Sequence, residues 1–550
     1  MIPGRLQSIL RGDRLDFTDE PPEGGGRRIV LTASRAEMAD FGMDPFIAFY
    51  NTFPHKLVRR AVEKYFQSRP NPDGTERFAL YGLRKVEALL KEKYGDDVVV
   101  AHPDNLHRFI GPRTELVGIS TMDPVGLAYV STTYNSILGF GGISMNAVEF
   151  KALLNHPSIK RYRENFKILV GGAGVWQIRD SGWQKELGID YLFRGEAEES
   201  LLEVVEKILK GEKLPPYIVG KPPDYNKTNI PVIKGGASYG MVEITRGCGR
   251  GCQFCTPTMR RRISLPLEHI MKEVEVNVRA GSEMIFLATE DAFLWNTHPN
   301  FVPNREALVK LYSTIASHPS VRYIQISHAA IAPVLADRKL LDELTPILLP
   351  KTRYTPDYKR TYKRPFVTVE VGIESGSPRI MKRYMRGKAL PFSVEKWPEI
   401  VVEGIGEFND HDWWPLCTLM TGLPGEREDD LIQTLNLIDD LKGSKVFLVP
   451  LFFIPLEEAI LGKERRADLK NISELQWEFI SRCWSQNIDF WAPQVRYYIG
   501  PAALAIYLSY LMWVHGPQVL RPLLKFTGLP ERVVGGYVGK GCDPSYCFAK

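Results

Sequence analysis

The chain has 550 residues, of which 44% are hydrophobic, and this length predicts roughly two to four domains with large apolar cores. Its formal net charge is +5 and the basic residues are dispersed, so the composition gives no sign of a nucleic-acid-binding surface. Residues 1–28 lack the apolar segment of a secretory signal, and seven cysteines fit a reducing compartment better than a disulfide scaffold. We therefore expect a cytoplasmic protein without a nucleic-acid partner.

The first part of the chain alternates strand-like and helical patterns. Apolar runs typical of buried strands occur at 28–33, 98–101, 116–120, 166–170 and 191–193. Amphipathic helical spacing occurs at 44–66, 81–94, 146–154 and 198–209. This alternation indicates an α/β fold with a parallel, doubly wound Rossmann-like sheet. Such sheets bind ligands at the carboxyl ends of their strands, where Ser120, Gly171 and Gly172 lie, although a tight turn explains the two glycines equally well.

A segment rich in Pro, Lys and Gly, residues 215–240, predicts a linker to a second unit. A strand-like stretch at 241–245 then leads into three cysteines at C-x3-C-x2-C spacing: Cys248, Cys252 and Cys255. Cysteine thiolates are the usual ligands of iron–sulfur clusters, and three thiolates leave one of four irons open to another ligand. The interleaved glycines allow positive φ, which turns backbone N–H groups toward the sulfurs.

Zinc is the alternative metal for three clustered cysteines. A structural zinc site takes four ligands, normally as two closely spaced Cys or His pairs. No second pair follows within the next several tens of residues, so the spacing favours iron and sulfur.

Strands and helices continue to alternate beyond the cysteines. After 241–245, predicted strands cover 283–288, 321–327, 365–371, 416–420 and 446–453. With helices between them, these six strands predict a partial (β/α)6 barrel, whose active site lies on loops at the carboxyl ends of the strands. Polar residues or glycines stand at those ends: Glu290, Asp291, His328, Glu374, Ser375, Gly422 and Gly425. Each alone is explained by a turn, a helix cap or a satisfied core histidine.

The cysteine spacing, with Phe254 directly before the last cysteine, resembles the radical S-adenosylmethionine superfamily. The resemblance implies that Cys248, Cys252 and Cys255 hold a [4Fe-4S] cluster and that the amine and carboxylate of S-adenosylmethionine chelate its open iron. It implies an enzyme, served by a one-electron donor of the ferredoxin or flavodoxin type.

The order of the strand-end residues adds to the likeness. Glu290 or Asp291 would accept a hydrogen bond from the amino group of S-adenosylmethionine. Glu374 and Ser375 belong to a G-I-E-S-G stretch that, in the family, helps to bind the ribose and methionyl part. Gly422 and Gly425 belong to a G-L-P-G-E loop similar to the family's own.

Residues 28–212 resemble the cobalamin-binding domain of the B12-type subclass of this superfamily, through Val117–Ser120, Val170–Gly172 and Phe193–Glu198. Ser120, Gly171 and Gly172 would then line the cofactor site. The D-x-H-x-x-G signature that supplies a histidine to cobalt is absent, and Asp123–Gly126 contains no histidine. The sequence therefore leaves open whether cobalamin is a third cofactor.

We predict four parts: an N-terminal extension at 1–27, a B12-binding-like Rossmann domain at 28–225, a radical barrel at 226–460 and a mainly helical region at 461–550. In the last part, Trp477, Trp484 and Trp491 recur every seven residues, as in a packed helical seam. Residues 500–514 are uncharged and apolar but short for a membrane span, so they predict either a buried helix or one that lies in a bilayer interface. Cys542 and Cys547 are interpreted as idle thiols, a disulfide or half of an auxiliary iron site.

Three functions remain at this point. The first is an enzyme that forms a C–C bond at an unactivated carbon of a lipid or other apolar molecule, as the architectural resemblance to archaeal tetraether-lipid ring synthases suggests, with peripheral membrane contact. The second is a cobalamin-dependent radical methyltransferase. The third is an iron–sulfur electron carrier without catalysis. No G-x-S-x-G or H-E-x-x-H motif points to hydrolysis.

Overall fold

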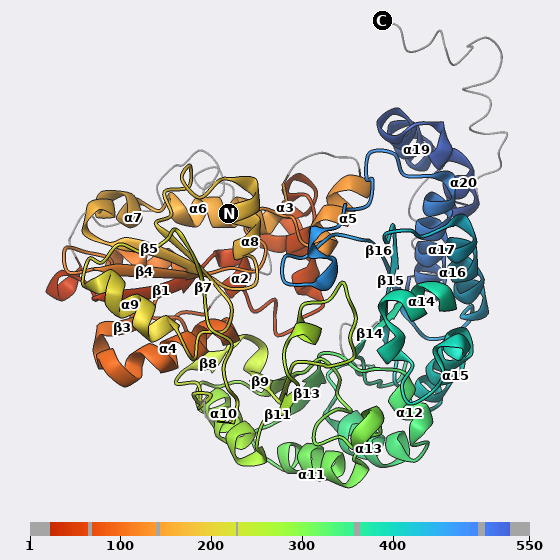
Figure 1. The fold of residues 1–550 in the computed structure, drawn as a ribbon, viewed down its shortest axis with the longest axis horizontal. Coiled ribbons are helices and arrows are strands. Elements are labelled where there is room, and N and C mark those ends of the chain that lie inside the picture. Colours follow the sequence, from red (N-terminus) through yellow and green to blue (C-terminus); the bar gives the residue numbers. More distant parts are fainter. Residues whose placement is uncertain are drawn as a thin grey trace, which may run out of the picture.

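Six strands of the N-terminal unit form one parallel sheet in the order β3-β1-β4-β5-β6-β7 (Figure 1). The computed structural model describes residues 22–63, 69–138, 143–226, 229–356, 363–492 and 501–527. The strands are β1 (Ile29–Ala33), β3 (Val98–Val100), β4 (Leu116–Ser120), β5 (Lys167–Gly171), β6 (Tyr191–Arg194) and β7 (Tyr217–Val219). The chain runs from β1 outward to β3 and returns to β4 on the other side of β1. This reversal makes the predicted doubly wound sheet and places its switch point between β1 and β4.

Both faces of this sheet are covered, which explains the near-continuous apolar strands. One face packs against α6 (Met145–Leu154), α7 (Pro157–Arg161) and α8 (Val175–Ser181). The other packs against α4 (Tyr81–Tyr94) and α9 (Leu201–Leu209). Successive residues of β1 point to opposite faces: Val30 joins the first core, and Ile29 and Leu31 join the second.

Two predictions in this unit are wrong in detail. The predicted helix at 44–66 is a 3-10 turn (Ile47–Thr52) followed by α3 (His55–Glu63), because Pro54 forces the preceding Phe53 into an extended conformation. The predicted linker contains β7, which pairs with β6 and extends the sheet by one strand, and β8 (Gly236–Ala237), which pairs with β2 (Phe78–Ala79). The proline and glycine residues around these short strands hide them from pattern analysis.

The second unit is the predicted partial (β/α)6 barrel. Its strands are β9 (Met241–Glu243), β12 (Met284–Ala288), β13 (Tyr323–Ile326), β14 (Glu370–Glu374), β15 (Leu416–Thr421) and β16 (Phe447–Phe452). They form two parallel three-stranded sheets that are joined by a parallel bridge between His328 and Glu370. The sequence predicts the fourth strand at 365–371. It lies a few residues later, at Glu370–Glu374, so Gly372 and Glu374 lie within it.

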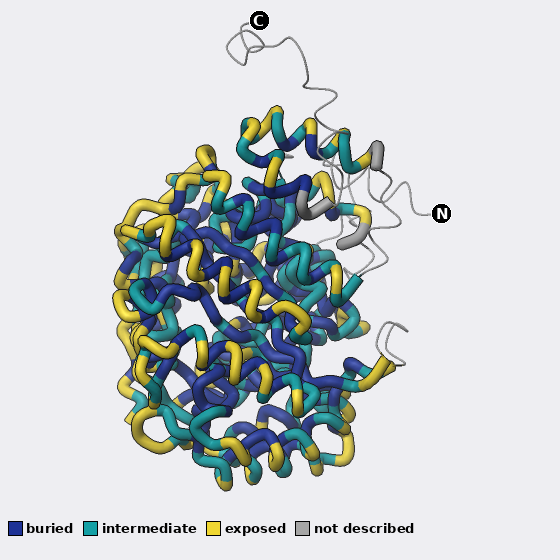
Figure 2. Tube along the Cα trace, turned by 90° about the vertical axis from the view of Figure 1, so that its right-hand side faces the viewer, coloured by how far each residue is buried: buried dark blue, intermediate teal, exposed yellow. Residues whose placement is uncertain are grey.

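Helices follow the barrel strands in turn and cover the outside (Figure 1). They are α10 (Leu267–Arg279), α11 (Arg305–Ala316), α12 (Ala332–Ala336), α13 (Leu340–Leu348), α14 (Pro378–Tyr384), α15 (Trp397–Asp410) and α16 (Glu428–Asp440). Figure 2 shows the strands of both units as the buried interior of the molecule. The domain boundaries themselves, 28–225 and 226–460, stay predictions.

The C-terminal region contributes α17 (Glu474–Trp491), α19 (Pro501–His515) and α20 (Leu520–Thr527). α17 closes the barrel beside β16: Trp477 is 1% exposed, and Trp484 and Trp491 pack on Phe447 with ring centroids 5.9 and 6.3 Å away. The tryptophans therefore form the predicted packed seam. Among the described residues, no helix has both the length and the apolar character needed to cross a bilayer. Cys542, Cys547 and most of the predicted N-terminal extension lie outside the described residues.

Candidate active site

The three predicted metal ligands lie on one loop that leaves β10 (Thr245–Arg246). The glycines of this loop all have positive φ, as the sequence predicts: Gly247, Gly249 and Gly251. A Cβ at Gly247 would meet the carbonyl oxygen of Arg261 at 2.7 Å, so glycine is required there for steric reasons as well. The backbone thus winds closely around the cysteines.

The cysteines have the chemistry of a site for a positively charged cluster. All three thiols are free, and burial raises their pKa values, to about 11 at Cys252. The thiolates would also repel one another, since Cys248 raises the pKa of Cys252 and Cys252 that of Cys255. A cluster of iron removes both penalties, so the donor set fits. No three described His, Cys, Asp or Glu side chains converge as a single ion requires, whereas each thiolate of a four-iron cluster binds its own iron.

A buried ion pair anchors the loop to the barrel. Arg250 donates to the Asp291 carboxylate at 2.9 Å and to the Gly387 carbonyl at 3.0 Å. The other oxygen of Asp291 accepts from the backbone N–H groups of Phe293 and Ala330, each at 3.1 Å. Asp291 is therefore used by the protein itself.

Glu290 is placed differently. Within the described residues its carboxylate makes no hydrogen bond or ion pair, and burial raises its pKa while the charge of His328 lowers it. Its own charge raises the pKa values of Cys248 and Cys255, so it lies beside the cysteines. Of the two predicted contacts to an amino group, the structure leaves Glu290 available.

His328 lies between carboxylates at the strand ends. Its Nε2 is 3.1 Å from Glu370, and a hydrogen bond to the Thr289 carbonyl further favours the protonated ring. Although burial lowers the pKa of His328, these partners and Glu290 raise it overall to about 9. The His328 side chain is 47% exposed and paired with Glu370, which corrects the interpretation as a core histidine.

A second cation near the cysteines, Lys388 in the 3-10 turn Arg386–Lys388, pairs with the end of β14. Lys388 donates to Glu374 at 3.0 Å and to the Gly372 carbonyl at 2.8 Å, and its charge lowers the pKa values of Cys252 and Cys255. A Cβ at Gly372 would meet the Lys388 ammonium at 2.2 Å, so this pair requires glycine in the strand.

Three other predicted residues have partners that fix the backbone. Ser375 is 0% exposed, and its hydroxyl contacts Thr434 of α16 at 3.2 Å. Gly422 and Gly425 have positive φ, and the Gly422 N–H donates to Glu426 at 2.6 Å, which closes the G-L-P-G-E loop on itself. These positions shape the rim of the barrel.

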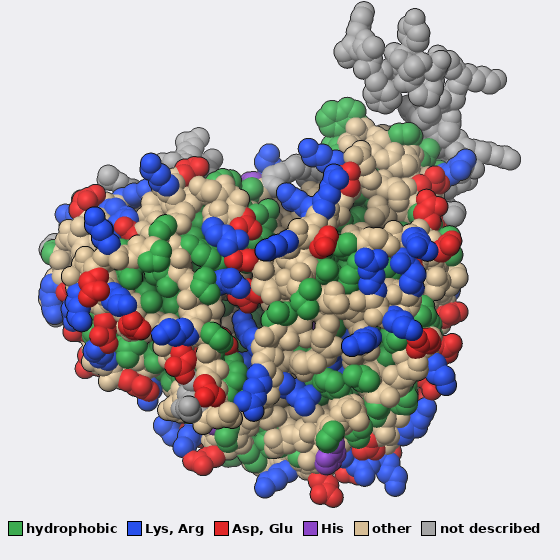
Figure 3. Space-filling model, in the orientation of Figure 1, with side chains coloured by type: hydrophobic (Ala, Val, Ile, Leu, Met, Phe, Trp, Pro, Cys, Tyr) green, Lys and Arg blue, Asp and Glu red, His purple; other side chains and the backbone are tan. Residues whose placement is uncertain are grey.

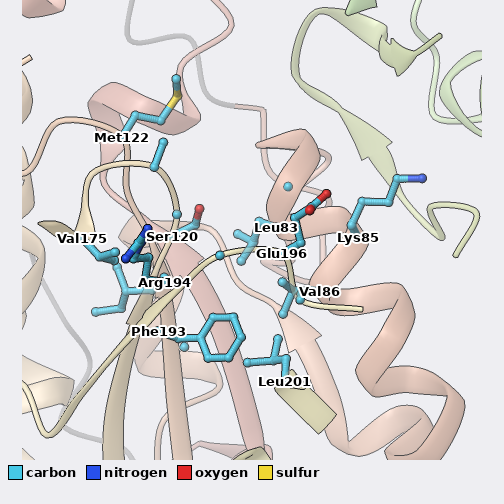
Figure 4. Close-up of a pocket in the computed structure, with 18 of the residues that line it drawn as sticks. Leu83, Lys85, Val86, Ser120, Met122, Val175, Phe193, Arg194, Glu196 and Leu201 are labelled. Atoms are coloured by element: carbon cyan, nitrogen blue, oxygen red, sulfur yellow. The ribbon is translucent and has the colours of Figure 1, made fainter. Parts of the chain in front are cut away.

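The predicted residues of the Rossmann sheet line a cavity of about 510 Å³ between the two units. Ser120, Gly171 and Gly172 lie at its edge, where β4 and β5 end. Its deeper walls are mainly apolar: Leu31, Leu83, Val86, Leu116, Leu169, Phe193 and Leu201. Figure 4 shows Phe193, Val86 and Leu201 together on one side of the cavity and Ser120 and Arg194 on another. No described residue that lines it is a histidine.

This cavity reaches the cysteine loop. Its lining includes Thr256, which follows Cys255, and Tyr129 of α5 (Tyr129–Ile137). Tyr129 donates to the Phe254 carbonyl at 3.3 Å, and the two rings meet edge to face.

Arg246, directly before the loop, is 9% exposed and joins the two units. It pairs with Glu243 of the barrel and, across the cavity, with Glu196 and Glu198 at 2.9 and 2.8 Å.

The comparisons with known proteins agree with this geometry. The family model described as the Radical SAM superfamily matches residues 242–438, which contain the cysteine loop and five of the six barrel strands. Residues 242–438 are therefore a radical SAM domain. Such a domain implies a [4Fe-4S] cluster and S-adenosylmethionine as cofactors.

The curated relatives are distant. A tRNA-2-methylthio-N(6)-dimethylallyladenosine synthase of Bdellovibrio bacteriovorus is 22% identical over 52% of this chain and 58% of its own length. Ribosomal protein uS12 methylthiotransferase RimO of Aromatoleum aromaticum is 24% identical over 38% of this chain and 44% of its own. The chain thus spans about half the length of these relatives, 58% of one and 44% of the other, and their substrates are stated for those proteins alone.

A solved structure has a similar fold over most of this chain. The radical S-adenosylmethionine methyltransferase TsrM of Kitasatospora setae, with cobalamin and a [4Fe-4S] cluster bound, has a TM-score of 0.50 and 13% identity over 79% of this chain and 74% of its own. The same enzyme with tryptophan and a SAM analogue scores 0.51 over 79% and 75%. At this identity the likeness shows the fold.

Sequence reasoning missed four residues that organise the site: Tyr129, Arg246, Arg250 and Lys388. Arg246 precedes the cysteines and Arg250 lies between the first two of them, so their positions in the sequence could have indicated a role at the site. Their partners lie far along the chain and could not be read from it. On the face in Figure 3, acidic and basic side chains are interspersed, with several basic ones along the hollow between the units. The absence of a nucleic-acid partner stays a prediction.

Proposed function

We propose that this enzyme forms a C–C bond at an unactivated carbon of an apolar substrate, most simply by ring closure in a membrane lipid. When bound, the cluster and S-adenosylmethionine supply a 5'-deoxyadenosyl radical, which removes a hydrogen atom from a C–H bond. The protein contributes the positions of the bound groups, the exclusion of water and the choice of carbon.

The charges around the cysteines support this use of S-adenosylmethionine. Cys248, Cys252 and Cys255 would hold the cluster. Glu290, the carboxylate without a protein partner, would accept from the amino group, and Lys388 would face the carboxylate from the other side. A carboxylate and an ammonium that both act on the pKa of Cys255 match a zwitterionic ligand. His328, held protonated, would keep the negative charge of Glu290 and Glu370 balanced.

The observation that carries the apolar substrate is the course of α5 across the carboxyl ends of the barrel strands. At its start Tyr129 touches the cysteine loop at Phe254. One turn later Thr133 accepts from the N–H of Phe452, at the end of β16, at 3.1 Å. At its end the Ile137 carbonyl lies 3.2 Å from His515 of α19. α5 therefore leads from the cluster loop to a helix without a single Asp, Glu, Lys or Arg.

Atom balance sets the test. Joining two carbons by ring closure removes two hydrogen atoms, so it consumes two S-adenosylmethionine molecules and two electrons from an external low-potential donor. Anaerobic incubation with lipid extracts should give a product lighter by two hydrogens and two 5'-deoxyadenosines per bond formed. A product heavier by CH2 would contradict this proposal.

The cavity between the units favours a second candidate, a cobalamin-dependent methyltransferase. Its apolar walls, its position at the switch point of a Rossmann sheet and its opening toward Thr256 suit a large flat cofactor with an inserted tail. Without a lining histidine, cobalt would have no lower ligand from the described residues of this cavity. Reconstitution with cobalamin should give corrinoid absorbance and a product gaining CH2; bound cobalamin with a product losing two hydrogens would separate the cofactor from the reaction. A non-catalytic electron carrier has no use for the barrel and its charged residues.

A further inference from the structure

One helix leaves large apolar side chains on the surface. Within α19, Ile506 is 72% exposed and Trp513 is 75% exposed. Beside them, Tyr510 contacts Trp513 and stacks on Tyr507, and both tyrosines are partly buried against the core. We call these four side chains the α19 face. The opposite side of the helix, with Leu508 and Leu511, is buried in the core.

This composition is unusual for a helix with one side in water. A helix at the surface of a soluble protein carries its charges on the outer side, whereas α19 has none from Pro501 to His515. Tyr and Trp side chains next to aliphatic ones are typical of membrane interfaces, where an apolar ring body and a polar tip are both satisfied. The helix is too short to span a bilayer and suits one lying along its surface.

The charge of the neighbouring sequence favours an anionic lipid surface as the partner of the α19 face. Residues 490–530 contain no Asp or Glu but include Arg496, Arg521 and Lys525. Arg521, on α20 next to α19, is exposed. Basic residues beside an apolar helix attract anionic lipid headgroups, each by a modest amount.

We propose that the α19 face is a docking surface for an anionic lipid bilayer. Ile506 and Trp513 enter the headgroup region, with the partly buried Tyr510 between them and the core, Arg521 stays at its surface, and α5 connects the docked helix with the cluster loop. The substrate role of the membrane rests on the proposed function, but the docking itself does not.

The test measures binding of the full-length protein to vesicles by co-sedimentation. We expect binding to phosphatidylcholine vesicles that contain phosphatidylglycerol and weaker binding to phosphatidylcholine alone. The double variant Ile506→Ser, Trp513→Ser should bind about tenfold or more weakly, because two large apolar side chains leave the lipid. Arg521→Glu should weaken binding about fivefold or more on anionic vesicles only.

The matched control is Ile432→Ser on α16, which removes an apolar side chain that is 43% exposed outside the α19 face. It should bind vesicles as the unmodified chain does. All variants change exposed side chains, and circular dichroism verifies that they fold.

Two results would overturn the proposal. One is equal vesicle binding by the double variant and the unmodified chain. The other is a change in oligomeric state of the double variant by light scattering without any vesicle binding, which would assign the face to a second copy of the chain. Activity on detergent-solubilised lipid separates the two proposals: product without vesicle binding removes the docking surface alone, and vesicle binding without product removes the proposed reaction alone.

Discussion

The two regions that meet at the cysteine loop, the carboxyl end of the barrel and the cavity of the Rossmann sheet, carry different side chains. The carboxyl end of the barrel carries Glu290, His328, Glu370, Glu374 and Lys388, a set of charges of which all but Glu290 are paired. The cavity of the Rossmann sheet has a mainly aliphatic wall, and charged side chains such as Arg194, Glu196 and Arg246 also line it. Both regions lie where parallel strands end, so the fold alone does not choose the ligand. The charged set at the barrel and the large apolar wall of the cavity distinguish the two.

The largest effect on cluster binding and activity should come from the cysteine loop, where the two regions meet. Cys252→Ser removes a cluster ligand, so the anaerobically reconstituted protein should lose its iron–sulfur absorbance and all formation of 5'-deoxyadenosine. Cys417→Ala, which changes a fully buried cysteine of β15, is the control and should keep both. Loss of the cluster in the control and not in Cys252→Ser would contradict the assignment.

The next effect concerns Glu290 and Asp291, of which only Asp291 is paired with another side chain of the protein. Asp291→Asn leaves Arg250 buried without its counter-charge and should lower the free energy of unfolding by about 3 kcal/mol or more. Glu290→Gln breaks no protein contact and should leave stability nearly unchanged. It should instead weaken S-adenosylmethionine binding about tenfold to a hundredfold, because a hydrogen bond between charged groups is lost. Calorimetric binding and denaturant unfolding measure the two effects, and the opposite pattern would reverse the roles.

Cobalamin binding in the cavity of the Rossmann sheet is tested at Gly171, which lines it. Its φ is not positive, and a Cβ there would have its nearest neighbour, the Phe193 carbonyl, 3.8 Å away, so Gly171→Leu should fold. The larger side chain should reduce or abolish cobalamin binding, measured by corrinoid absorbance, while S-adenosylmethionine binding stays intact. If Gly171→Leu loses the binding of both cobalamin and S-adenosylmethionine, the cavity and the barrel end are not separate binding sites.

The smallest effect concerns pH. The folded-state pKa of His328, raised to about 9 from 6.5, means that protonation stabilises the fold fully below pH 6.5 and that this contribution is lost as pH rises through 9. The unfolding free energy of the unmodified chain should therefore fall more between pH 6.5 and 9 than that of His328→Gln. If urea titrations show the same loss of unfolding free energy between pH 6.5 and 9 in the unmodified chain and in His328→Gln, the paired imidazolium is contradicted.

Local patterns carried much of the fold and of the site. The cysteine spacing, the glycines with positive φ and the strand ends depend on short stretches of chain, and each was found. The decision between Glu290 and Asp291 was out of reach, because it depends on Arg250, forty-one residues earlier, turning its guanidinium to one carboxylate. β7 was hidden for a similar reason: three residues after two prolines become a strand only because β6 offers an open edge.

Arg246 links the cavity of the Rossmann sheet to the barrel through its ion pairs. It binds two carboxylates of the Rossmann unit and one of the barrel, and the very next peptide begins the cysteine loop. A ligand that widens the cavity would displace the carboxylates that hold this guanidinium, and Arg246 stands two residues before Cys248. Occupancy of the cavity is thereby coupled to the position of the first cluster ligand.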